Sequence, residues 1–351
     1  MNFSLTDNHE TSVITEVYDH TLREELSSVK HKIDDVCREW DKIKRTLHDY
    51  EYVYTSANPT KNISHVSPIS RSYFKMKEIL QVFEINITRD DTVTCLAEAP
   101  GGFIQCILET SVPHVHGITL ISEDKKTPYW NRILCKETRV SFHVGRSNNG
   151  DLYDFKNILG FIHELGHHTM TLVTGDGGFD NSDDYNNQES NSLKLIYSEI
   201  YLALHLQKIG GSFICKLFDT FERETISLLY VLRLCYHEVS FYKPCISRIS
   251  NSEKYIVCKG FRGYETHLMN QLTHHFEDNQ LHLDIPISFY NEIQDYMKLY
   301  GDQQQTSIER GLEMIQKRRY LRYPTTFQVD IAKEWCTTYR VPLNTRCQFL
   351  R

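Results

Sequence analysis

Short apolar runs alternate with helical stretches through the middle of the chain, and this alternation constrains the fold most. The apolar runs have the length of strands and lie at 92–97, 116–121, 140–144, 170–174, 211–217, 239–242 and 254–259. Stretches with helical spacing lie between them, at 103–110, 152–165, 192–209 and 223–235. Alternation of strands and helices predicts a mostly parallel sheet with helices on both faces, an α/β fold.

The last two apolar runs are separated by too few residues for a crossover helix, so they should form an antiparallel hairpin at the end of the sheet. In such a fold, ligands bind at the C-terminal ends of the strands. Residues 51–68 are polar, contain two prolines and read as a linker, followed by a helix over 71–83. From about residue 265 the chain is aromatic-rich and helical in pattern.

Apolar residues recur with 4-3 spacing from Leu22 to Tyr50. This stripe predicts one long amphipathic helix, with two possible roles. The helix could form a coiled-coil arm that binds a second copy or a partner, or it could pack on the chain's own domain. We favour packing, because Trp40 and Tyr50 within the stripe are untypical of a coiled coil.

Composition excludes several classes of protein. Hydrophobic residues make up 40% of the 351 residues and charged residues 24%, which excludes wholesale disorder. With 39 basic and 46 acidic residues the formal charge is −7, which excludes nucleic-acid binding through bulk positive charge but not through a local groove. The ten cysteines form no C-x-x-C pair and lie mostly in apolar runs, which favours reduced thiols inside the cell. We expect neither secretion nor membrane spanning, because there is no basic-then-apolar leader and no apolar run of about 18 residues.

The segment 96–103, LAEAPGGF, follows the first predicted strand and precedes a helix. Two glycines let the backbone approach a ligand, and the helix that follows offers free N–H groups. The segment is not G-x-G-x-x-G, so it does not imply a dinucleotide. A small cofactor with an adenosine and a carboxylate would fit, and so would a tight turn without a ligand.

Three charged residues lie at, or close to, the ends of predicted strands. Asp176 stands between glycines after the fourth predicted strand, Lys216 lies inside an apolar strand, and Glu253 directly precedes the last strand. A surface ion pair would explain each residue singly. Their shared placement at strand ends predicts that they converge on one cleft.

The runs EAPGGF, GDGGF, GGSFICKLFD and KPCISRISNSEKYIVCKGF resemble the FtsJ/RrmJ class of S-adenosylmethionine-dependent RNA ribose 2′-O-methyltransferases. The chain is most similar to the branch that methylates the mRNA cap in eukaryotes and large DNA viruses. The resemblance covers roughly residues 65–262. It implies a Rossmann-like methyltransferase core over 66–265, whose mostly parallel seven-stranded sheet ends in an antiparallel hairpin. Helical extensions are expected over 1–65 and 266–351.

The resemblance also implies a catalytic Lys-Asp-Lys-Glu tetrad, matching Lys75, Asp176, Lys216 and Glu253. A ribose hydroxyl is a poor nucleophile near neutral pH, so it needs a base as the methyl group arrives. A lysine can serve only if burial or a second cation lowers its pKa toward about 7–8. We expect Lys216 to be the base and Lys75 to supply the second positive charge, while Asp176 and Glu253 orient the two amines.

For the cofactor, S-adenosylmethionine, the resemblance implies contacts to its methionine end and to its adenine. The implied residues are Glu98, Ala99, Pro100, Gly101, Gly102, Phe103, Asp151 and Asp176. Asp151 matches the acid that contacts adenine. Two positions depart from the family: many relatives carry an acid where this chain has Cys95, and others have one after the second strand, where it reads Gly117-Ile118-Thr119. Glu98 is expected to take over part of the first role.

RNA contacts must come from local charge. Lys243 and Arg248 are the candidates for phosphate contact, with Ser247 and Asn251 beside them. The run 317–323, KRRYLRY, interleaves cations with aromatics and fits either an RNA-binding surface or a solvated helix end.

The run 163–167, HELGH, matches the H-E-x-x-H motif of zinc proteases, with Glu189 and Glu199 at possible third-ligand spacing. It lies only a few residues before a strand and lacks the longer metzincin pattern. We therefore expect a helix end on the far side of the sheet and no metal.

The sequence thus predicts an enzyme that methylates a ribose 2′-hydroxyl of capped mRNA. Two alternatives stay open: a ribose methyltransferase of ribosomal or small RNA, and a non-catalytic subunit that binds RNA or a partner. Expected partners are capped mRNA and, through the N-terminal helix, a second copy or a protein of the capping machinery. We expect an intracellular location, nuclear for a cellular protein and in the host cytoplasm for a viral one, and no membrane.

Overall fold

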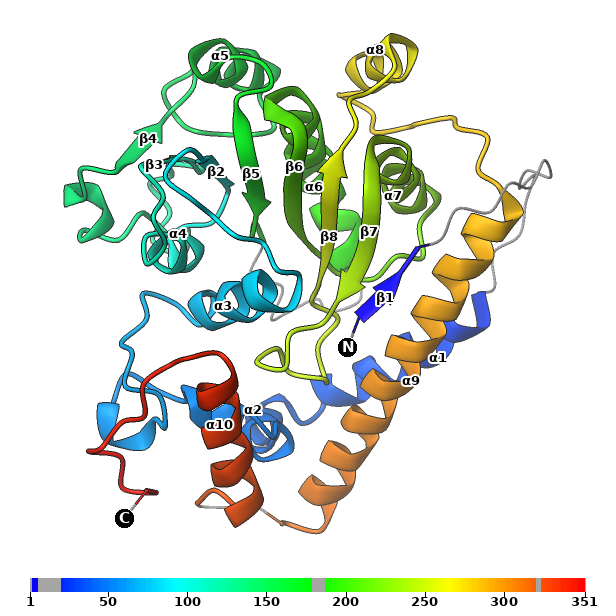
Figure 1. Cartoon of the computed structure of the whole chain (residues 1–351). Coiled ribbons are helices and arrows are strands. Elements are labelled where there is room, and N and C mark those ends of the chain that lie inside the picture. Colours follow the sequence, from blue (N-terminus) through cyan, green and yellow to red (C-terminus); the bar gives the residue numbers. More distant parts are fainter. Residues whose placement is uncertain (1, 6–19, 179–186, 320–322, 351) are drawn as a thin grey trace. The chain divides into compact units, whose positions relative to one another are not determined.

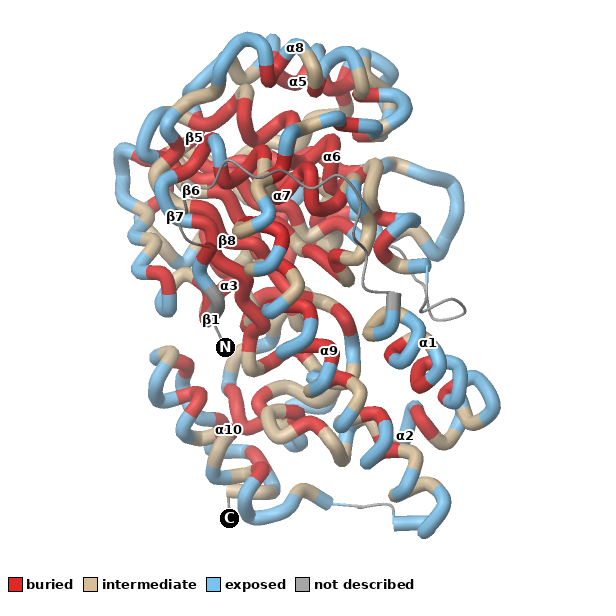
Figure 2. Tube along the Cα trace, turned by 90° about the vertical axis from the view of Figure 1, so that its right-hand side faces the viewer, coloured by how far each residue is buried: buried red, intermediate tan, exposed pale blue. Residues whose placement is uncertain are grey.

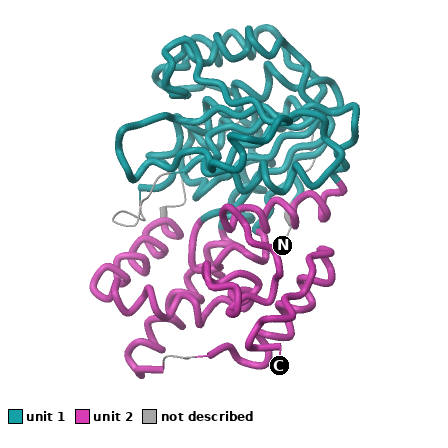
Figure 3. Tube along the Cα trace, turned by 90° about the vertical axis from the view of Figure 1, so that its left-hand side faces the viewer, with its two compact units in different colours: residues 1–18, 85–243, 253–297 teal, residues 19–84, 244–252, 298–351 magenta. Residues whose placement is uncertain are grey.

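The computed structural model describes residues 2–5, 20–178, 187–319 and 323–350 (Figure 1). The chain forms two compact units (Figure 3). Unit 1 comprises residues 1–18, 85–243 and 253–297, and unit 2 comprises residues 19–84, 244–252 and 298–351. The sequence predicted three consecutive regions, 1–65, 66–265 and 266–351. The two units are not consecutive in this way, because segments from both ends of the chain and the loop 244–252 share unit 2.

Unit 1 is built on a mixed sheet of eight strands in the order β1-β7-β8-β6-β5-β2-β3-β4 (Figure 1). The strands are β1 (Asn2–Ser4), β2 (Thr92–Leu96), β3 (His114–Ile118), β4 (Val140–His143), β5 (Met170–Gly175), β6 (Gln207–Leu217), β7 (Tyr236–Tyr242) and β8 (Lys254–Phe261). Strands β4, β3, β2, β5 and β6 run parallel, whereas β8 is antiparallel to both β6 and β7. All seven expected strands form, and the terminal hairpin is confirmed, with β8 inserted between β6 and β7.

The eighth strand, β1, was not predicted. It pairs antiparallel with β7, Phe3 opposite Phe241. The expected helical extension over 1–65 therefore begins differently, because a short strand adds to the sheet edge before the first helix.

The helices of unit 1 are α4 (Gly102–Ile107), α5 (Phe155–Leu165), α6 (Gln188–Leu206), α7 (Arg223–Cys235), α8 (Thr266–His274) and the start of α9 (Ile287–Gln316), with a 3₁₀ turn at Leu134–Lys136. Helix α6 packs against β5 and β6 and lies beside α5 and α7, while α7 packs against β7. Buried residues concentrate in the strands and in α6 and α7 (Figure 2). The core of unit 1 thus lies between the sheet and this layer of helices.

Unit 2 is helical. It contains α1 (His20–Asp34), α2 (Cys37–Leu47), α3 (Ser72–Val82), the later part of α9 and α10 (Thr326–Thr338), with 3₁₀ turns at Glu51–Val53 and Pro59–Lys61. The interpretation of 51–68 as a linker is wrong. Val53 and Ile63 are completely buried, and Ser64 forms a β-bridge with Leu343, so this segment is a packed part of unit 2.

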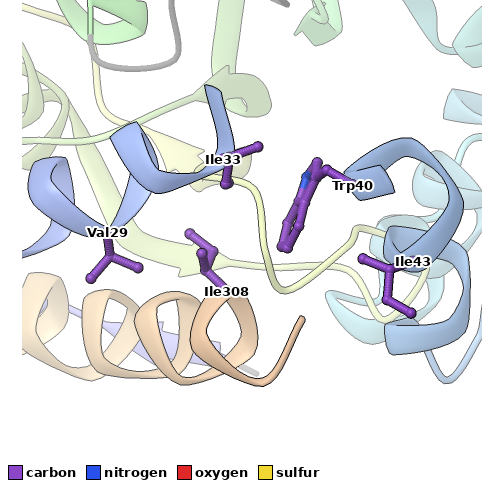
Figure 4. Packing of buried hydrophobic residues seen from close by; sticks show 5 residues of the cluster. All are labelled: Val29, Ile33, Trp40, Ile43 and Ile308. Atoms are coloured by element: carbon purple, nitrogen blue, oxygen red, sulfur yellow. The ribbon is translucent and has the colours of Figure 1, made fainter. Parts of the chain in front are cut away.

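The predicted single N-terminal helix is two helices, because the chain turns at Val36. The apolar stripe continues across the break. Val29 and Ile33 of α1 and Trp40 and Ile43 of α2 gather around Ile308 of α9 (Figure 4). The stripe therefore packs on the chain's own helices, which is the interpretation that we favoured.

Among the described residues, no helix combines the length and the apolar character that a membrane span requires.

Candidate active site

The site lies at the carboxyl edge of the parallel strands in unit 1. Strands β2, β5 and β6 are neighbours, so the residues that end them meet at one edge. Asp176 directly follows β5, and its N–H donates to the carbonyl of Leu96 at the end of β2, at 3.3 Å. Lys216 lies near the end of β6. The turn before α4 and the two charged residues are thereby brought together.

Lys216 and Asp176 form a mostly buried ion pair. The side chain of Lys216 is 12% exposed, and its Nζ lies 3.4 Å from Oδ1 of Asp176. The same Nζ donates to the main-chain carbonyl of Asp176 at 2.8 Å. Burial lowers the pKa of Lys216, but Asp176, Glu253 and Glu199 outweigh burial and raise this pKa above its ordinary value. The expectation of a lowered pKa is therefore wrong for the chain without ligands, because acids surround the ammonium group.

Tyr255 completes this arrangement, and sequence reasoning gave it no role. It lies opposite Lys216 in the antiparallel β6–β8 pair, so both side chains point to the same face of the sheet. The completely buried Tyr255 donates its hydroxyl to Oδ1 of Asp176 at 2.7 Å. Burial and then Asp176 raise the pKa of Tyr255 well above 10, which keeps it a hydrogen-bond donor. Its ring packs on Phe103 at 5.9 Å, which links the glycine turn to the ion pair.

Glu253 contributes to the same electrostatic environment, since it raises the pKa of Lys216. Its position is fixed by Lys243. The ammonium group of this buried lysine donates to the main-chain carbonyl of Glu253 at 2.7 Å. Lys243 thus has a structural contact inside unit 1, and its contact with an RNA phosphate stays a prediction.

The turn that precedes α4 requires a glycine and lies beside a buried acid. Gly101 has φ +107°, and a Cβ there would lie 2.3 Å from a side-chain carbon of Leu134. Glu98 is 3% exposed, and neither of its carboxyl oxygens has a hydrogen-bond partner among the described residues. Burial raises the pKa of Glu98 well above its ordinary value. A buried acid without a partner, beside such a turn, fits a ligand that brings a polar or cationic group.

Asp151 lies after β4, at the same edge of the sheet. Its Oδ1 accepts a hydrogen bond from the N–H of Tyr153 at 2.9 Å. The preceding Gly150 has φ +64°, and a Cβ there would lie 1.9 Å from the carbonyl oxygen of Thr119. Glycine therefore lets the loop that carries Asp151 approach the chain just after β3.

Aromatic rings occupy the space beside Gly117 of β3. A Cβ on Gly117 would lie 3.0 Å from Phe142 and 3.2 Å from Trp130. The rings of Trp130 and Phe142 stack on each other at 4.3 Å. These two rings leave no room for a side chain at Gly117 without a shift of Phe142 or Trp130.

The other predicted site residues belong to unit 2. Arg248 directs Nε and Nη2 at Glu51, at 3.2 and 3.0 Å, and the Glu51 carboxylate is completely buried. Ser247 is buried and Asn251 is exposed. An RNA contact through Arg248 or Ser247 therefore gains no support. Lys75 is half-buried on α3 of unit 2, and its membership in the tetrad stays a prediction.

The HELGH run does not have the geometry of a zinc-binding helix. Helix α5 ends at Leu165, and Gly166 follows with φ +80°, so His167 is not on the helix. Glu164 instead pairs with Nδ1 of His143 at 2.7 Å. No group of three or more His, Cys, Asp or Glu residues suited to a metal exists within the described ranges. Of the basic run 317–323, residues 320–322 lie outside the described residues, and Lys317 pairs with Glu313.

The sheet order and the groups at its carboxyl edge define a Rossmann-like methyltransferase. A model of the FtsJ-like methyltransferase family matches residues 68–261, which is more than half of the chain. The chain therefore belongs to the FtsJ-like methyltransferase family, and the resemblance inferred from its motifs is confirmed.

Curated relatives include two proteins named for the mRNA cap. Cap-specific mRNA (nucleoside-2′-O-)-methyltransferase 1 of Caenorhabditis elegans is 39% identical over 201 residues, which cover 54% of this chain and 22% of the relative. Cap-specific mRNA (nucleoside-2′-O-)-methyltransferase 2 of Danio rerio is 29% identical over 272 residues, covering 70% of this chain and 36% of the relative. The chain thus spans well under half the length of these relatives.

Among solved structures, a chain described as a ribosomal RNA methyltransferase from Plasmodium falciparum is similar, with 20% identity and a TM-score of 0.42. The match covers 56% of the present chain and 100% of the Plasmodium falciparum chain. This likeness is too low to support an inference about function.

S-adenosylmethionine is the methyl donor of this family. The residues at the carboxyl edge fit it. The buried acid of Glu98, whose oxygens have no hydrogen-bond partner among the described residues, would suit the amino group of its methionine end, and Gly101 lies in the same turn. Both belong to the set that the resemblance implied.

Replacing Tyr255 by phenylalanine should lower methyl transfer about tenfold and the free energy of unfolding by about 1–2 kcal/mol, because Asp176 loses a charged hydrogen bond. Tyr197→Phe is a matched control: its buried hydroxyl also makes a 2.7 Å hydrogen bond, but to Leu272, away from the site. Steady-state kinetics and urea unfolding of both variants provide the comparison. Equal activities in the two variants would show that Tyr255 only stabilises the fold.

Proposed function

We propose that this chain transfers a methyl group from S-adenosylmethionine to a ribose 2′-hydroxyl of capped mRNA. The observation that carries the proposal is the buried pair of Lys216 and Asp176, which Tyr255 and Phe103 connect to the glycine turn before α4. A buried ammonium group next to a cofactor cradle is the feature that ribose methylation needs, because the acceptor hydroxyl must lose its proton.

S-adenosylmethionine supplies a methyl group on a positively charged sulfur. The acceptor 2′-oxygen forms the new bond to the methyl carbon, and the carbon–sulfur bond breaks with its electron pair left on sulfur. The hydroxyl proton goes to Nζ of Lys216, which is held in place by the carbonyl and the carboxylate of Asp176. The chain thus contributes positioning and a proton acceptor and forms no covalent intermediate.

Lys216 can accept that proton only after giving up its own. The surrounding acids raise its pKa in the chain without ligands, so a cation brought to the site must oppose them. We assign this task to Lys75, as the resemblance implies, together with the charge of the sulfonium group. Glu253 and Asp176 then keep the amine oriented in either protonation state.

Capped RNA is the substrate we favour, because both curated relatives above are named for cap methylation.

The apolar stripe of α1 and α2 packs on α9. A homodimer, or a partner from the capping machinery, would therefore have to bind other surfaces of these helices. All ten cysteines are free, which supports a place of action inside the cell.

The test is transfer of a tritiated methyl group to three RNAs: a capped transcript, the same transcript without its cap, and a ribosomal RNA fragment. We expect label only in the capped transcript, at a ribose that resists alkaline hydrolysis. Label in the ribosomal fragment alone would replace the proposal with a different RNA substrate. Failure to bind S-adenosylmethionine in calorimetry would favour a non-catalytic subunit.

A further inference from the structure

A second buried acid lies behind the ion pair and is not one of the four tetrad positions. Glu199 of α6 is completely buried. Its Oε1 accepts the N–H of Gly177 at 3.3 Å, and its Oε2 accepts the thiol of Cys215 at 3.1 Å. Gly177 follows Asp176, and Cys215 precedes Lys216. One carboxyl group therefore holds both strand ends that carry the ion pair.

The link to Lys216 runs through a single peptide unit. The carbonyl of Asp176 accepts a hydrogen bond from Nζ of Lys216 at 2.8 Å, and the N–H on the other side of the same peptide bond belongs to Gly177. A peptide unit is planar and polar, so its carbonyl faces the ammonium while its N–H faces the carboxyl group. Groups joined in this way polarise each other.

The backbone leaves room for this carboxyl group. A Cβ on Gly175 would lie 2.6 Å from the carboxyl carbon of Glu199, and a Cβ on Gly177 would lie 2.8 Å from its Oε1. The two glycines that flank Asp176 therefore seat Glu199 directly behind the catalytic loop.

We propose that Glu199 is a positioning residue that controls the charge state of Lys216 through the peptide unit between Asp176 and Gly177. The consequence for methyl transfer rests on the proposed function above, whereas the coupling itself is a property of the chain alone.

Ionisation of Glu199 supports this coupling. Burial raises its pKa to about 8, against the lowering effects of Cys215, Lys216 and the Gly177 N–H. Asp176 from the β5 loop also raises the pKa of Glu199, and Glu199 in turn raises the pKa values of Glu98 in the β2 turn and Tyr153 after β4. As pH rises through about 8, Glu199 becomes charged and then helps to raise the pKa of Lys216.

The test is the titration of Lys216 in the chain without cofactor. The ε-carbon signal of ¹³C-labelled lysine, assigned with Lys216→Arg, reports the pKa. Glu199→Gln keeps an acceptor for Gly177 and a group facing Cys215 but removes the charge. We expect the pKa of Lys216 to fall by about one unit in this variant. An unchanged titration would overturn the proposal.

Glu189→Gln is the matched control. Glu189 is also a buried acid on α6 with a raised pKa, about 7, but it accepts the N–H groups of Phe221 and Glu222. We expect no shift of Lys216 in this control, and an equal shift would contradict the proposed route. If Glu199→Gln does not fold, Cys215→Ala serves instead. Loss of the thiol should raise the pKa of Glu199 and lower the pKa of Lys216 by less than Glu199→Gln does. An unchanged Lys216 titration in this variant would also overturn the proposal.

The second readout is the pH profile of methyl transfer. Its ascending limb follows the deprotonation of Lys216, so in Glu199→Gln this limb should move to lower pH by the same amount as the Lys216 titration. If the unaltered chain transfers no methyl group, the proposed function fails while the titration still tests the coupling. If transfer occurs but the two shifts disagree, Glu199 does not act through Lys216.

Discussion

Replacing Lys216 by alanine is expected to lower methyl transfer to capped RNA by a factor of about 10²–10⁴, with S-adenosylmethionine binding retained. The variant removes the group that takes the hydroxyl proton, but it leaves the turn from Ala97 to Gly101 and the unpartnered acid of Glu98 in place. Single-turnover rates measure the first effect and calorimetry the second.

Lys208→Ala is the matched control for Lys216→Ala. Lys208 lies on the same strand, β6, but its side chain is 41% exposed and pairs with Asp91 at 3.4 Å. We expect its transfer rate to stay within about twofold of the unaltered chain, since Lys208 lies at the start of β6 and Lys216 near its end. Transfer at full rate by Lys216→Ala would remove Lys216 from the mechanism.

Replacing Glu51 by alanine is expected to lower the free energy of unfolding of unit 2 by about 3 kcal/mol, since Arg248 would lose its buried partner. Glu51 is completely buried, and it also lies 3.7 Å from Nη1 of Arg71. Both arginines would lose this counter-charge, and a cavity would remain at the position of the Glu51 carboxylate. Urea unfolding in a Trp130→Phe background measures the loss, because Trp40 and Trp335, both in unit 2, then supply the tryptophan fluorescence.

Asp330→Ala controls for the loss of an ordinary ion pair. Asp330 is 63% exposed and pairs with Lys333 at 3.0 Å, so we expect a change below about 0.5 kcal/mol. If Glu51→Ala cost no more than Asp330→Ala, the buried pair would not stabilise the loop 244–252.

Strands β2 to β8 of unit 1 were predictable because their apolar residues are bounded by glycine, proline or charged residues. Strand β7 starts three residues earlier than expected, at Tyr236, because His237 and Glu238 are exposed positions of a strand whose partner β8 continues to Phe261. Strand β1 could not be predicted. Three residues carry no periodic signal, and their place is decided by pairing with β7.

The break between α1 and α2 was hidden by the stripe itself. The 4-3 spacing continues from Ile33 to Trp40 even though the helix stops, because both helices pack on the same stretch of α9. Gly311 in α9 lies under Trp40, where a Cβ would be 2.5 Å from the ring. Such a contact joins residues about 270 positions apart, so the sequence around either residue gives no signal of it.

The candidate site was predictable where a charge interrupts an apolar pattern, as at Asp176 and Lys216. Tyr255 and Glu199 were missed for a physical reason. A tyrosine on a strand and a glutamate on a helix are ordinary at those places, and their roles depend on strand register and on how α6 packs against β5. The pKa of Lys216 was predicted in the wrong direction because the number of nearby acids, Glu199 included, appears only after folding.

A crystal structure with S-adenosylhomocysteine and a short capped RNA tests the central claim most directly. We expect Nζ of Lys216 to lie within hydrogen-bond reach, about 2.6–3.2 Å, of one ribose 2′-oxygen. We also expect that Asp176 still contacts the amine and that Lys75 has joined the group. A 2′-oxygen placed against a different base, with Lys216 turned away from it, would contradict the account.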